Sequence, residues 1–574
     1  MGLFILSRRE RPDPLQPAWL AAHRRHGFRE PLRLTAGDWR LDLFGALNGL
    51  GPQLVQRDNG DFAACTGVFF YRGARGTAGL EPLLDDFDGE RFPWSGSRGH
   101  FAVIVCKAGR MFLATDALGG YKVYHDGGRT LLSSSFTALR ANLAQATPDA
   151  QGAWEYAWNG ATYGTRTFIR EIRQLRRGSL LTLGPQAEIS AEYRLPAADA
   201  PQHASIDEAA EDYADRLRAL FRVYAAGGGR FRTALSGGYD SRLMLALLLD
   251  AGLDPQVYVY GRAGDDDVRV AKAIATGEGL ALEHVDKSQT APPPSAGHTE
   301  RAWVRFDGWK NDGLFDSGVD AEDRLLRVPG DVSVLNGSAG EVFRNFFYLP
   351  ERRYRARDVA WSFYSRYDPQ AMTDAFDAEA YDTAMSADLR AAIGADARDD
   401  APLTRAGIEA LYPLHRARYW TARDVGLNQR FGPLLFPYLE PAVFSGTERE
   451  PIAWKDYGRL EAKIIERVHP ALARYPSAYG FVPADGPDLR YRLKMQLTFL
   501  RPTWLRRYSY RLQQRGPLPP RPVWLGDAAL SAAGLDPALP HMRALFVPER
   551  LRDAEVFNRV CTMELALAGQ PLPG

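Results

Sequence analysis

The chain has 574 residues, and 71 basic side chains balance 70 acidic ones to give a formal net charge of +1. This length exceeds what one hydrophobic core usually organises, so we expect two large domains. The near-neutral charge excludes a strongly basic nucleic-acid-binding protein, and no run approaches the roughly 18 apolar residues of a membrane-spanning helix. We therefore expect a cytoplasmic protein that acts on a small molecule or peptide, with no nucleic-acid and no membrane partner. The oligomeric state stays open.

Residues 1–200 alternate short apolar runs with glycine and polar turns, the pattern of strands joined in hairpins. Two such turns are Lys107-Ala108-Gly109 and Asp126-Gly127-Gly128. The segment from Leu195 to Tyr213 is rich in Ala, Pro and Asp and ends in a helical pattern, as expected for a linker that enters a second domain. We place the two domains at residues 1–200 and 201–574.

Three cysteines lie far apart in the sequence without metal-ligand spacing, and we expect them to be reduced and structural: Cys65, Cys106 and Cys561.

From residue 230 onward, strand patterns alternate with helix patterns. Strands are predicted at Arg230–Leu235, Gln256–Gly261, Ala281–Asp286 and Asp331–Gly337, and helices at Ser241–Leu249 and Asp265–Gly279. Strands separated by single helices predict a doubly wound parallel sheet, whose ligands bind at the carboxyl ends of the strands. Beyond residue 350 the sequence is mostly helical.

The loop Ser-Gly-Gly-Tyr-Asp-Ser, from Ser236 to Ser241, follows the first of these strands. Adjacent glycines let the backbone approach a ligand, and the N–H groups at the start of the next helix can donate to an anion. The hydroxyls of Ser236 and Ser241 add donors. Asp240 would repel a phosphate unless it binds Mg²⁺, which takes carboxylate and phosphate oxygens together. The alternative is an ordinary junction between a strand and a helix.

This loop resembles the pyrophosphatase loop of the asparagine synthetase family, whose members split ATP between its alpha and beta phosphates to adenylate a carboxylate. "LNGSAGEVFRNFFY" resembles the family's Ser-Gly-Glu-Gly-Ala-Asp-Glu-Leu-Phe segment, "FPYLEPAVF" its Pro-Phe-Leu-Asp segment, and "EAKIIERVHPAL" its Glu-Lys-x-Ile-Leu-Arg helix. "GHFAVIV" and "TDALGGYKVYH" are similar to its glutaminase domain. The resemblance covers most of residues 60–480. It implies an α/β chain with an Ntn-hydrolase-like αββα domain, followed by a doubly wound ATP pyrophosphatase (PP-loop) domain with a helical C-terminal part.

The sequence departs from the family pattern in two places. Glutamine-using members carry a nucleophilic cysteine at position 2, but this chain has Gly2 and lacks the Asn-Gly-Glu motif. We therefore expect residues 1–200 to be an inactive scaffold, as in the similar beta-lactam synthetases and lasso peptide cyclases. The family's Arg-x-Lys lysine is also absent from "RYPSAYGFVPADG". Other lysines are the candidates to replace it: Lys463 first, then Lys455, Lys310 and Lys494.

The resemblance implies ATP and Mg²⁺ as cofactors. The expected nucleotide-binding residues are Leu235, Ser236, Gly237, Gly238, Tyr239, Asp240, Ser241, Tyr260, Gly261 and Gly337. Asp240 and Glu341 would hold the metal and, with Lys463, act in catalysis. Alternatively, Glu341 only opens a helix, where a carboxylate is favourable. Further residues near the site have a binding or a purely structural alternative: His284, Tyr419, Trp420 and Arg423.

The expected function is that of an ATP-dependent ligase that adenylates a substrate carboxylate, releases pyrophosphate and couples the acid to an amine without glutamine hydrolysis. Such a reaction suits natural-product or peptide biosynthesis. Two alternatives remain: a lasso peptide macrocyclase, and a catalytically silent homologue that acts as a partner or regulator.

Overall fold

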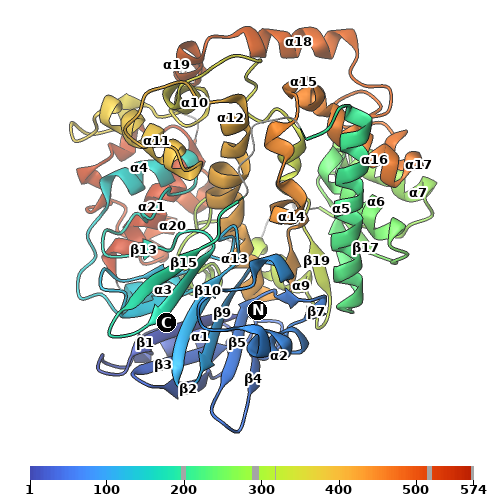
Figure 1. Cartoon of the computed structure of the whole chain (residues 1–574). Coiled ribbons are helices and arrows are strands. Elements are labelled where there is room, and N and C mark those ends of the chain that lie inside the picture. Colours follow the sequence, from blue (N-terminus) through green and yellow to red (C-terminus); the bar gives the residue numbers. More distant parts are fainter. Residues whose placement is uncertain (196–201, 287–295, 317, 514–519, 570–574) are drawn as a thin grey trace.

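Two six-stranded antiparallel sheets form the first part of the computed structural model, which describes the chain except residues 196–201, 287–295, 317, 514–519 and 570–574 (Figure 1). The first sheet has the order β13-β11-β12-β1-β3-β2 and contains β1 (Leu3–Arg8), β2 (Leu32–Ala36), β3 (Trp39–Phe44), β11 (Tyr124–His125), β12 (Leu131–Ser133) and β13 (Arg173–Gln174). The second has the order β15-β14-β10-β9-β5-β4 and contains β4 (Gln53–Gln56), β5 (Phe62–Gly67), β9 (Phe101–Lys107), β10 (Arg110–Thr115), β14 (Ser179–Leu183) and β15 (Ala187–Glu192). A small third sheet joins β6 (Phe70–Tyr71), β7 (Ala74–Arg75) and β8 (Ser97–Arg98).

The two large sheets pack face to face, and helices cover their outer faces. Alternate side chains such as Phe4 of β1 and Ile104 of β9 belong to the core between the sheets. The outer face of the second sheet packs on α2 (Thr77–Asp86), and that of the first on a cluster that includes residues of α1 (Pro17–Arg25), α3 (Phe136–Ala141) and α4 (Ala150–Asn159). The strands and both predicted turns are confirmed, because Lys107–Gly109 and Asp126–Gly128 lie between paired antiparallel strands.

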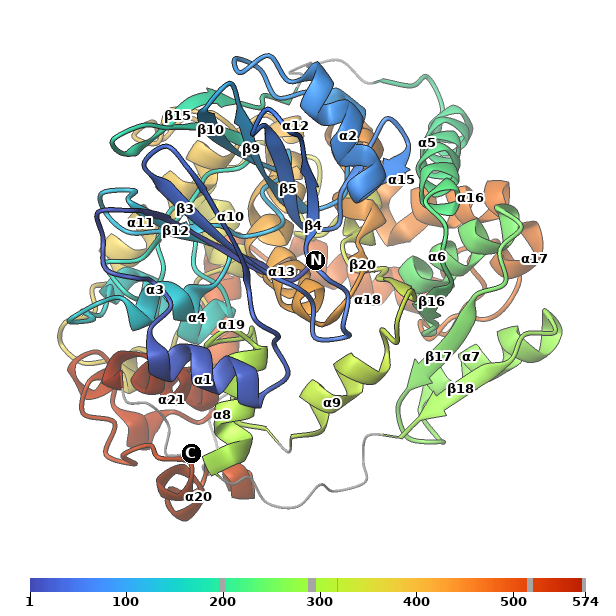
Figure 2. The same cartoon turned by 90° about the horizontal axis from the view of Figure 1, so that it is seen from below.

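A five-stranded parallel sheet follows the long helix α5 (Ile206–Ala226), and Figure 2 shows it with its helices. Its order is β18-β17-β16-β19-β20, formed by β16 (Phe231–Ala234), β17 (Gln256–Tyr260), β18 (Leu282–Val285), β19 (Ser333–Leu335) and β20 (Leu434–Leu435). The four predicted strands are confirmed, as are the helices α6 (Tyr239–Asp250) and α7 (Asp266–Gly277). Helix α6 begins two residues earlier than expected, so that Tyr239 and Asp240 lie in its first turn.

The remaining chain is mostly helical, as expected. It contains α8 (Ala296–Arg305), α9 (Val319–Leu326), α10 (Ala356–Phe363), α11 (Ala378–Ala392), α12 (Arg405–Leu411), α13 (Ala422–Phe431), α14 (Pro441–Phe444), α15 (Ile452–Lys455), α16 (Arg459–Val468), α17 (Pro470–Ala473), α18 (Leu489–Leu500), α19 (Thr503–Gln513), α20 (Asp527–Ala532) and α21 (Ala554–Ala568). Within the described residues, no helix has the length and apolarity needed to cross a membrane. The three cysteines are buried and free.

The largest core joins both parts of the chain, because it includes Leu3 and Ile5 of β1 together with Leu565 of α21. Arg140 of α3 also donates to the carbonyl oxygens of Ala566 and Leu567. The expected domain boundary near residue 200 falls on residues 196–201, which lie outside the described residues.

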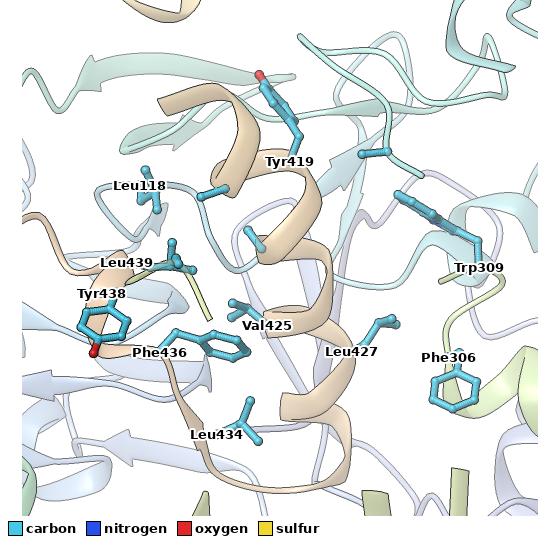
Figure 3. Packing of buried hydrophobic residues seen from close by; sticks show 14 of the residues in the cluster. Leu118, Phe306, Trp309, Tyr419, Val425, Leu427, Leu434, Phe436, Tyr438 and Leu439 are labelled. Carbon is cyan, nitrogen blue, oxygen red and sulfur yellow. The ribbon is translucent and has the colours of Figure 1, made fainter. Parts of the chain in front are cut away.

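A π-helical segment, η4 (Tyr412–Thr421), joins α12 to α13 in the middle of the molecule. Figure 3 shows Val425 of α13 pointing toward Phe436 and Leu439, and Leu427 pointing to the other side of the helix, where Trp309 and Phe306 lie. This packing fixes α13, from which Asp424 and Asn428 border the cavity described next.

Candidate functional site

The loop from Leu235 to Gly238 leaves the carboxyl end of β16, the central strand of the parallel sheet, and leads directly into α6. The amide of Leu235 still donates to Tyr258 of the neighbouring strand, so the turn begins after this residue. A Cβ atom at Gly237 would lie 2.6 Å from the Cβ of Ala478, so glycine is required for this close approach. The predicted glycine loop therefore occupies the strand end where ligands bind in parallel sheets.

The backbone amides of Ser236, Gly237 and Gly238 in the loop donate hydrogen bonds to side chains of the protein. The amide of Ser236 donates to Ser241 Oγ at 2.9 Å, and the two serine hydroxyls are also 2.9 Å apart. The amide of Gly238 reaches Ser236 Oγ at 3.3 Å. The amide of Gly237 donates to the carboxylate of Asp267 at 2.8 Å, so an anionic oxygen already occupies one loop N–H group.

A cavity of about 480 Å³ opens at this edge of the sheet. Of the residues predicted to bind nucleotide or metal, those that line it are Ser236, Asp240, Ser241, Tyr260, Gly337 and Glu341. The other predicted nucleotide-binding residues support the loop but are not among its lining residues: Leu235, Gly237, Gly238, Tyr239 and Gly261. Leu235 and Tyr239 are buried in the core.

Arg344 pairs with the two acidic residues of the cavity lining, Asp240 and Glu341, although it is not itself a lining residue. One of its terminal nitrogens donates to both oxygens of Asp240, at 2.7 and 2.6 Å, and lies 3.5 Å from Glu341 Oε1. The same nitrogen lies 2.6 Å from an oxygen of Asp240 and 3.5 Å from an oxygen of Glu341. These two oxygens are therefore at most about 6.1 Å apart. This separation is within the span of about 8 Å over which two carboxylates can share an ion and one bridging water.

Glu461 of α16 completes the cluster, and its side chain is fully buried. Arg344 Nε lies 3.2 Å from Glu461 Oε2, yet neither oxygen of Glu461 accepts a hydrogen bond within the described structure. Burial raises the pKa of Asp240 and that of Glu461, in each case against the lowering effect of Arg344. The three carboxylates in turn hold the pKa of Arg344 well above its usual value, despite its burial.

The cluster fits a divalent cation by charge. Three carboxyl groups share one guanidinium, and burial raises the pKa of two of them, so a further cation would stabilise their ionised forms. The oxygens of Glu461 also accept no hydrogen bond within the described structure. Among the described residues, no three His, Cys, Asp or Glu side chains lie close enough together to hold a metal ion. Within the cluster, Arg344 donates to both oxygens of Asp240. A magnesium ion therefore requires Arg344 to release Asp240.

A row of side chains on η4 and α13 also lines the cavity, and its members lie four residues apart: Tyr412, Arg416, Trp420, Asp424 and Asn428. Tyr412 donates its hydroxyl to Glu341 Oε2 at 2.5 Å. Arg416 lies over the ring of Trp420, 4.4 Å from its centroid, and makes no ion pair with any described residue. Of this row, only Trp420 is predicted from the sequence, although the regular spacing of polar or aromatic residues by four was a signal for the others.

Lys463 does not reach the cavity. It is half-exposed on α16, where it lies 3.1 Å from Glu466 and 3.7 Å from Asp207. Two residues correspond to more than half a helical turn, so Lys463 and the buried Glu461 face opposite sides of α16. The expected catalytic position of Lys463 thus lacks geometric support, and Glu461 is the residue of this helix that faces Asp240.

The other expected lysines also lie elsewhere. Lys455 pairs with Glu409 at 2.5 Å, and Lys310 pairs with Asp316 at 2.6 Å. Lys494 is exposed on α18.

The remaining candidates divide between the cavity and the core. Tyr260 lines the cavity and donates to Asp323 at 3.0 Å. His284 contacts the carbonyl oxygen of Gly261 at 2.8 Å, which is a structural role. Tyr419 is buried among aromatic rings, and Arg423 is buried with donors to backbone carbonyls, so neither lines the cavity.

Gly2 is fixed by tertiary contacts. Its amide donates to Gln429 of α13 at 3.0 Å, and Tyr121 donates to its carbonyl oxygen at 2.8 Å. Its φ of +83° favours glycine, and a Cβ atom there would collide with the carbonyl oxygen of Phe44. A cysteine side chain at position 2 would therefore strain this backbone.

No protein-family model and no curated protein matches the chain. Several solved structures resemble it weakly, and two of them are described here. The first, the allosteric regulatory enzyme of purine biosynthesis, has 12% identity, covers 51% of this chain and 82% of its own, and gives a TM-score of 0.22. The second, glutamine phosphoribosylpyrophosphate amidotransferase from B. subtilis complexed with ADP and GMP, has 12% identity, covers 60% of this chain and 76% of its own, and gives a TM-score of 0.23. At this similarity the two structures support no conclusion about the family or activity of this chain.

Proposed function

We propose that the chain is an AMP-forming carbon–nitrogen ligase related to the asparagine synthetases, with a PP-loop site in the cavity beside β16. The observation that carries the proposal is the glycine loop from Ser236 to Ser241, which opens at the carboxyl edge of a parallel sheet into a cavity of about 480 Å³. The two-sheet N-terminal part would be an Ntn-hydrolase-like scaffold without amidase activity.

Each wall of the cavity has a separate role in the proposed reaction. The hydroxyls of Ser236 and Ser241 and the amino end of α6 would bind the phosphates of ATP. Tyr260 and Gly337 would lie beside the adenosine. Arg416, which has no acidic partner among the described residues, would stabilise the charge that develops as pyrophosphate leaves, in place of the missing lysine.

Asp240, Glu341 and Glu461 would hold Mg²⁺. When bound, the ion would neutralise the carboxylates and the polyphosphate together. Arg344 must then turn from Asp240 towards another acceptor, and Tyr479 is within reach because its hydroxyl lies 3.3 Å from the second terminal nitrogen of Arg344.

The reaction would proceed in two displacements. An oxygen of the substrate carboxylate attacks the alpha phosphorus, the bond to the bridging oxygen breaks, and pyrophosphate leaves. The nitrogen of an amine then attacks the acyl carbon, loses a proton and expels AMP. The amine comes from a small molecule or peptide, because the surroundings of Gly2 do not accommodate a glutaminase cysteine.

A second candidate is a catalytically silent relative that acts as a partner or regulator. The contact of Arg344 with both oxygens of Asp240 favours it, because an internal cation there occupies the place of the metal.

Isotope exchange between pyrophosphate and ATP tests the ligase proposal. Purified protein with Mg²⁺ and pools of candidate acids should catalyse exchange, and Asp240→Ala should abolish it although the variant still unfolds in a cooperative thermal transition, at a lower temperature because Arg344 loses a partner. Lys463→Ala is the matched control on the opposite face of α16 and should exchange at the wild-type rate. Formation of ADP would exclude the proposed chemistry, and ATP binding without exchange for any acid would favour the silent relative.

A further inference from the structure

Helix α18 carries a row of leucines on its outer face. Figure 1 shows it along the top of the molecule, with α19 beside it. Leu489, Leu493, Leu497 and Leu500 have exposed fractions of 74, 59, 74 and 65%. At about 100° per residue they span only about 80° of the helix circumference, and thus form one stripe. Soluble proteins rarely leave four neighbouring leucines in water, so the stripe indicates an interaction surface.

The opposite face of α18 is well anchored. Phe499 is buried, with ring contacts to Tyr348 at 6.3 Å and Tyr457 at 5.8 Å. Tyr491 packs on Phe481 at 5.0 Å, and at the border of the leucine stripe Gln496 donates to the Tyr457 hydroxyl at 2.8 Å. These contacts fix the rotation of the helix about its axis, so the leucines face outward because the inner face is already occupied.

The sequence around the stripe is strongly basic. From Leu489 to Gly526 it contains nine Arg or Lys residues and no Asp or Glu, in a chain whose net charge is only +1. Arg490 and Lys494 are exposed at one border of the stripe and make no ion pair with a described residue, and Arg492 is exposed at the other. The net charge of the whole chain does not reveal this basic segment. The expectation of no membrane partner rested on that net charge.

We propose that the outer face of α18 binds the surface of a membrane that contains anionic lipids. The leucines would enter the boundary between head groups and acyl chains, while Arg490, Arg492 and Lys494 meet lipid phosphates. Trp504, which is 54% exposed at the start of α19, has the amphipathic ring that prefers this boundary. Charge complementarity selects this occupant over a second copy of the chain, because two such faces would bring like charges together.

Membrane binding would also place the cavity close to the bilayer. Tyr491 on the inner face of α18 contacts Tyr479 at 6.4 Å between ring centroids, and Tyr479 accepts a hydrogen bond from Arg344. The acidic cluster of the cavity is thus separated from α18 by one aromatic side chain.

Vesicle co-sedimentation of the full chain tests this proposal. The protein should bind vesicles of phosphatidylcholine with phosphatidylglycerol, and only weakly vesicles of phosphatidylcholine alone. Binding should weaken as salt rises from about 0.1 M to about 1 M, because the Debye length falls from about 10 Å to about 3 Å. Leu493→Glu/Leu497→Glu should reduce binding roughly tenfold or more. Lys494→Glu should reduce it by about fivefold or more.

Two matched controls change exposed residues elsewhere: Leu326→Glu on α9 and Lys272→Glu on α7 should bind as the wild type does. If the Leu493→Glu/Leu497→Glu variant does not fold, the uncharged double variant Leu493→Gln/Leu497→Gln replaces it in the same assay. The proposal is overturned by wild-type protein that ignores anionic vesicles, by equal binding to both lipid compositions, or by control variants that lose as much binding as the α18 variants. It is equally overturned if the leucine variants abolish a dimer while vesicle binding is unchanged.

Discussion

Replacement of Arg344 by Gln gives the sharpest test of the acidic cluster. The wild-type guanidinium is 2.6 Å from Asp240, 3.5 Å from Glu341 and 3.2 Å from Glu461. Removing one partner of a buried ion pair costs about 3–5 kcal/mol, because the remaining charge is left uncompensated. Here three carboxylates would lose their shared cation, so Arg344→Gln should lower the thermal unfolding temperature substantially.

Magnesium should reverse much of this loss. A ligand that binds only the folded state contributes about 2.7 kcal/mol when its concentration is 100 times its dissociation constant. With Arg344 removed, the ion no longer competes with a guanidinium for the two oxygens of Asp240. Mg²⁺ should therefore raise the unfolding temperature of Arg344→Gln more than that of the wild type, as followed by differential scanning fluorimetry across a magnesium titration.

Arg166→Gln is the matched control. Arg166 also bridges two carboxylates, those of Glu155 and Asp388, but neither of these lines the cavity, whereas Asp240 and Glu341 do. Its replacement should destabilise the protein without creating a response to Mg²⁺. An equal magnesium response of the two variants, or none in Arg344→Gln, would refute the reasoning that the cluster accepts a divalent ion.

Three further predictions concern the cavity and the N-terminal scaffold. Arg416→Met should slow pyrophosphate exchange by about 100-fold, on the scale of other deletions of charge-stabilising groups, and Arg416→Lys should restore part of it; equal exchange rates for the wild type and Arg416→Met would remove Arg416 from catalysis. Gly2→Cys should release no glutamate from glutamine and should lower the unfolding temperature, since its φ is +83° and a Cβ atom would meet Phe44; sustained glutamate release measured by an enzymatic assay would contradict this. Gly237→Ala should weaken ATP binding measured by calorimetry, because its Cβ would lie 2.6 Å from Ala478; unchanged affinity would show that the loop does not need this close approach.

The parallel sheet could be predicted from sequence because its strands and helices are local patterns. Apolar runs end at turn residues, and the acidic first turn of α7 begins at Asp266. Strand β20 was not predicted, since its two residues, Leu434 and Leu435, carry no periodic signal and pair with β19 only after a long helical insertion.

The contacts around Asp240 could not be predicted, because they join residues distant in sequence. Arg344 and Glu461 lie 104 and 221 positions beyond Asp240, and only tertiary packing brings the three together. The same limit explains why the prediction for Lys463 placed the wrong residue of α16 at the site. A motif indicates that α16 borders the site, but only the rotation of the helix about its axis determines that Glu461, two residues earlier, faces inward.

The most direct test of the central claim is a structure of the protein with Mg²⁺ and an ATP analogue whose bond between the alpha and beta phosphates cannot be cleaved. We expect the phosphates against Ser236, Ser241 and the amino end of α6, with the adenosine beside Tyr260 and Arg344 turned away from Asp240. A nucleotide bound outside this cavity, or a cavity that stays empty while Arg344 keeps both oxygens of Asp240, would contradict the proposed function.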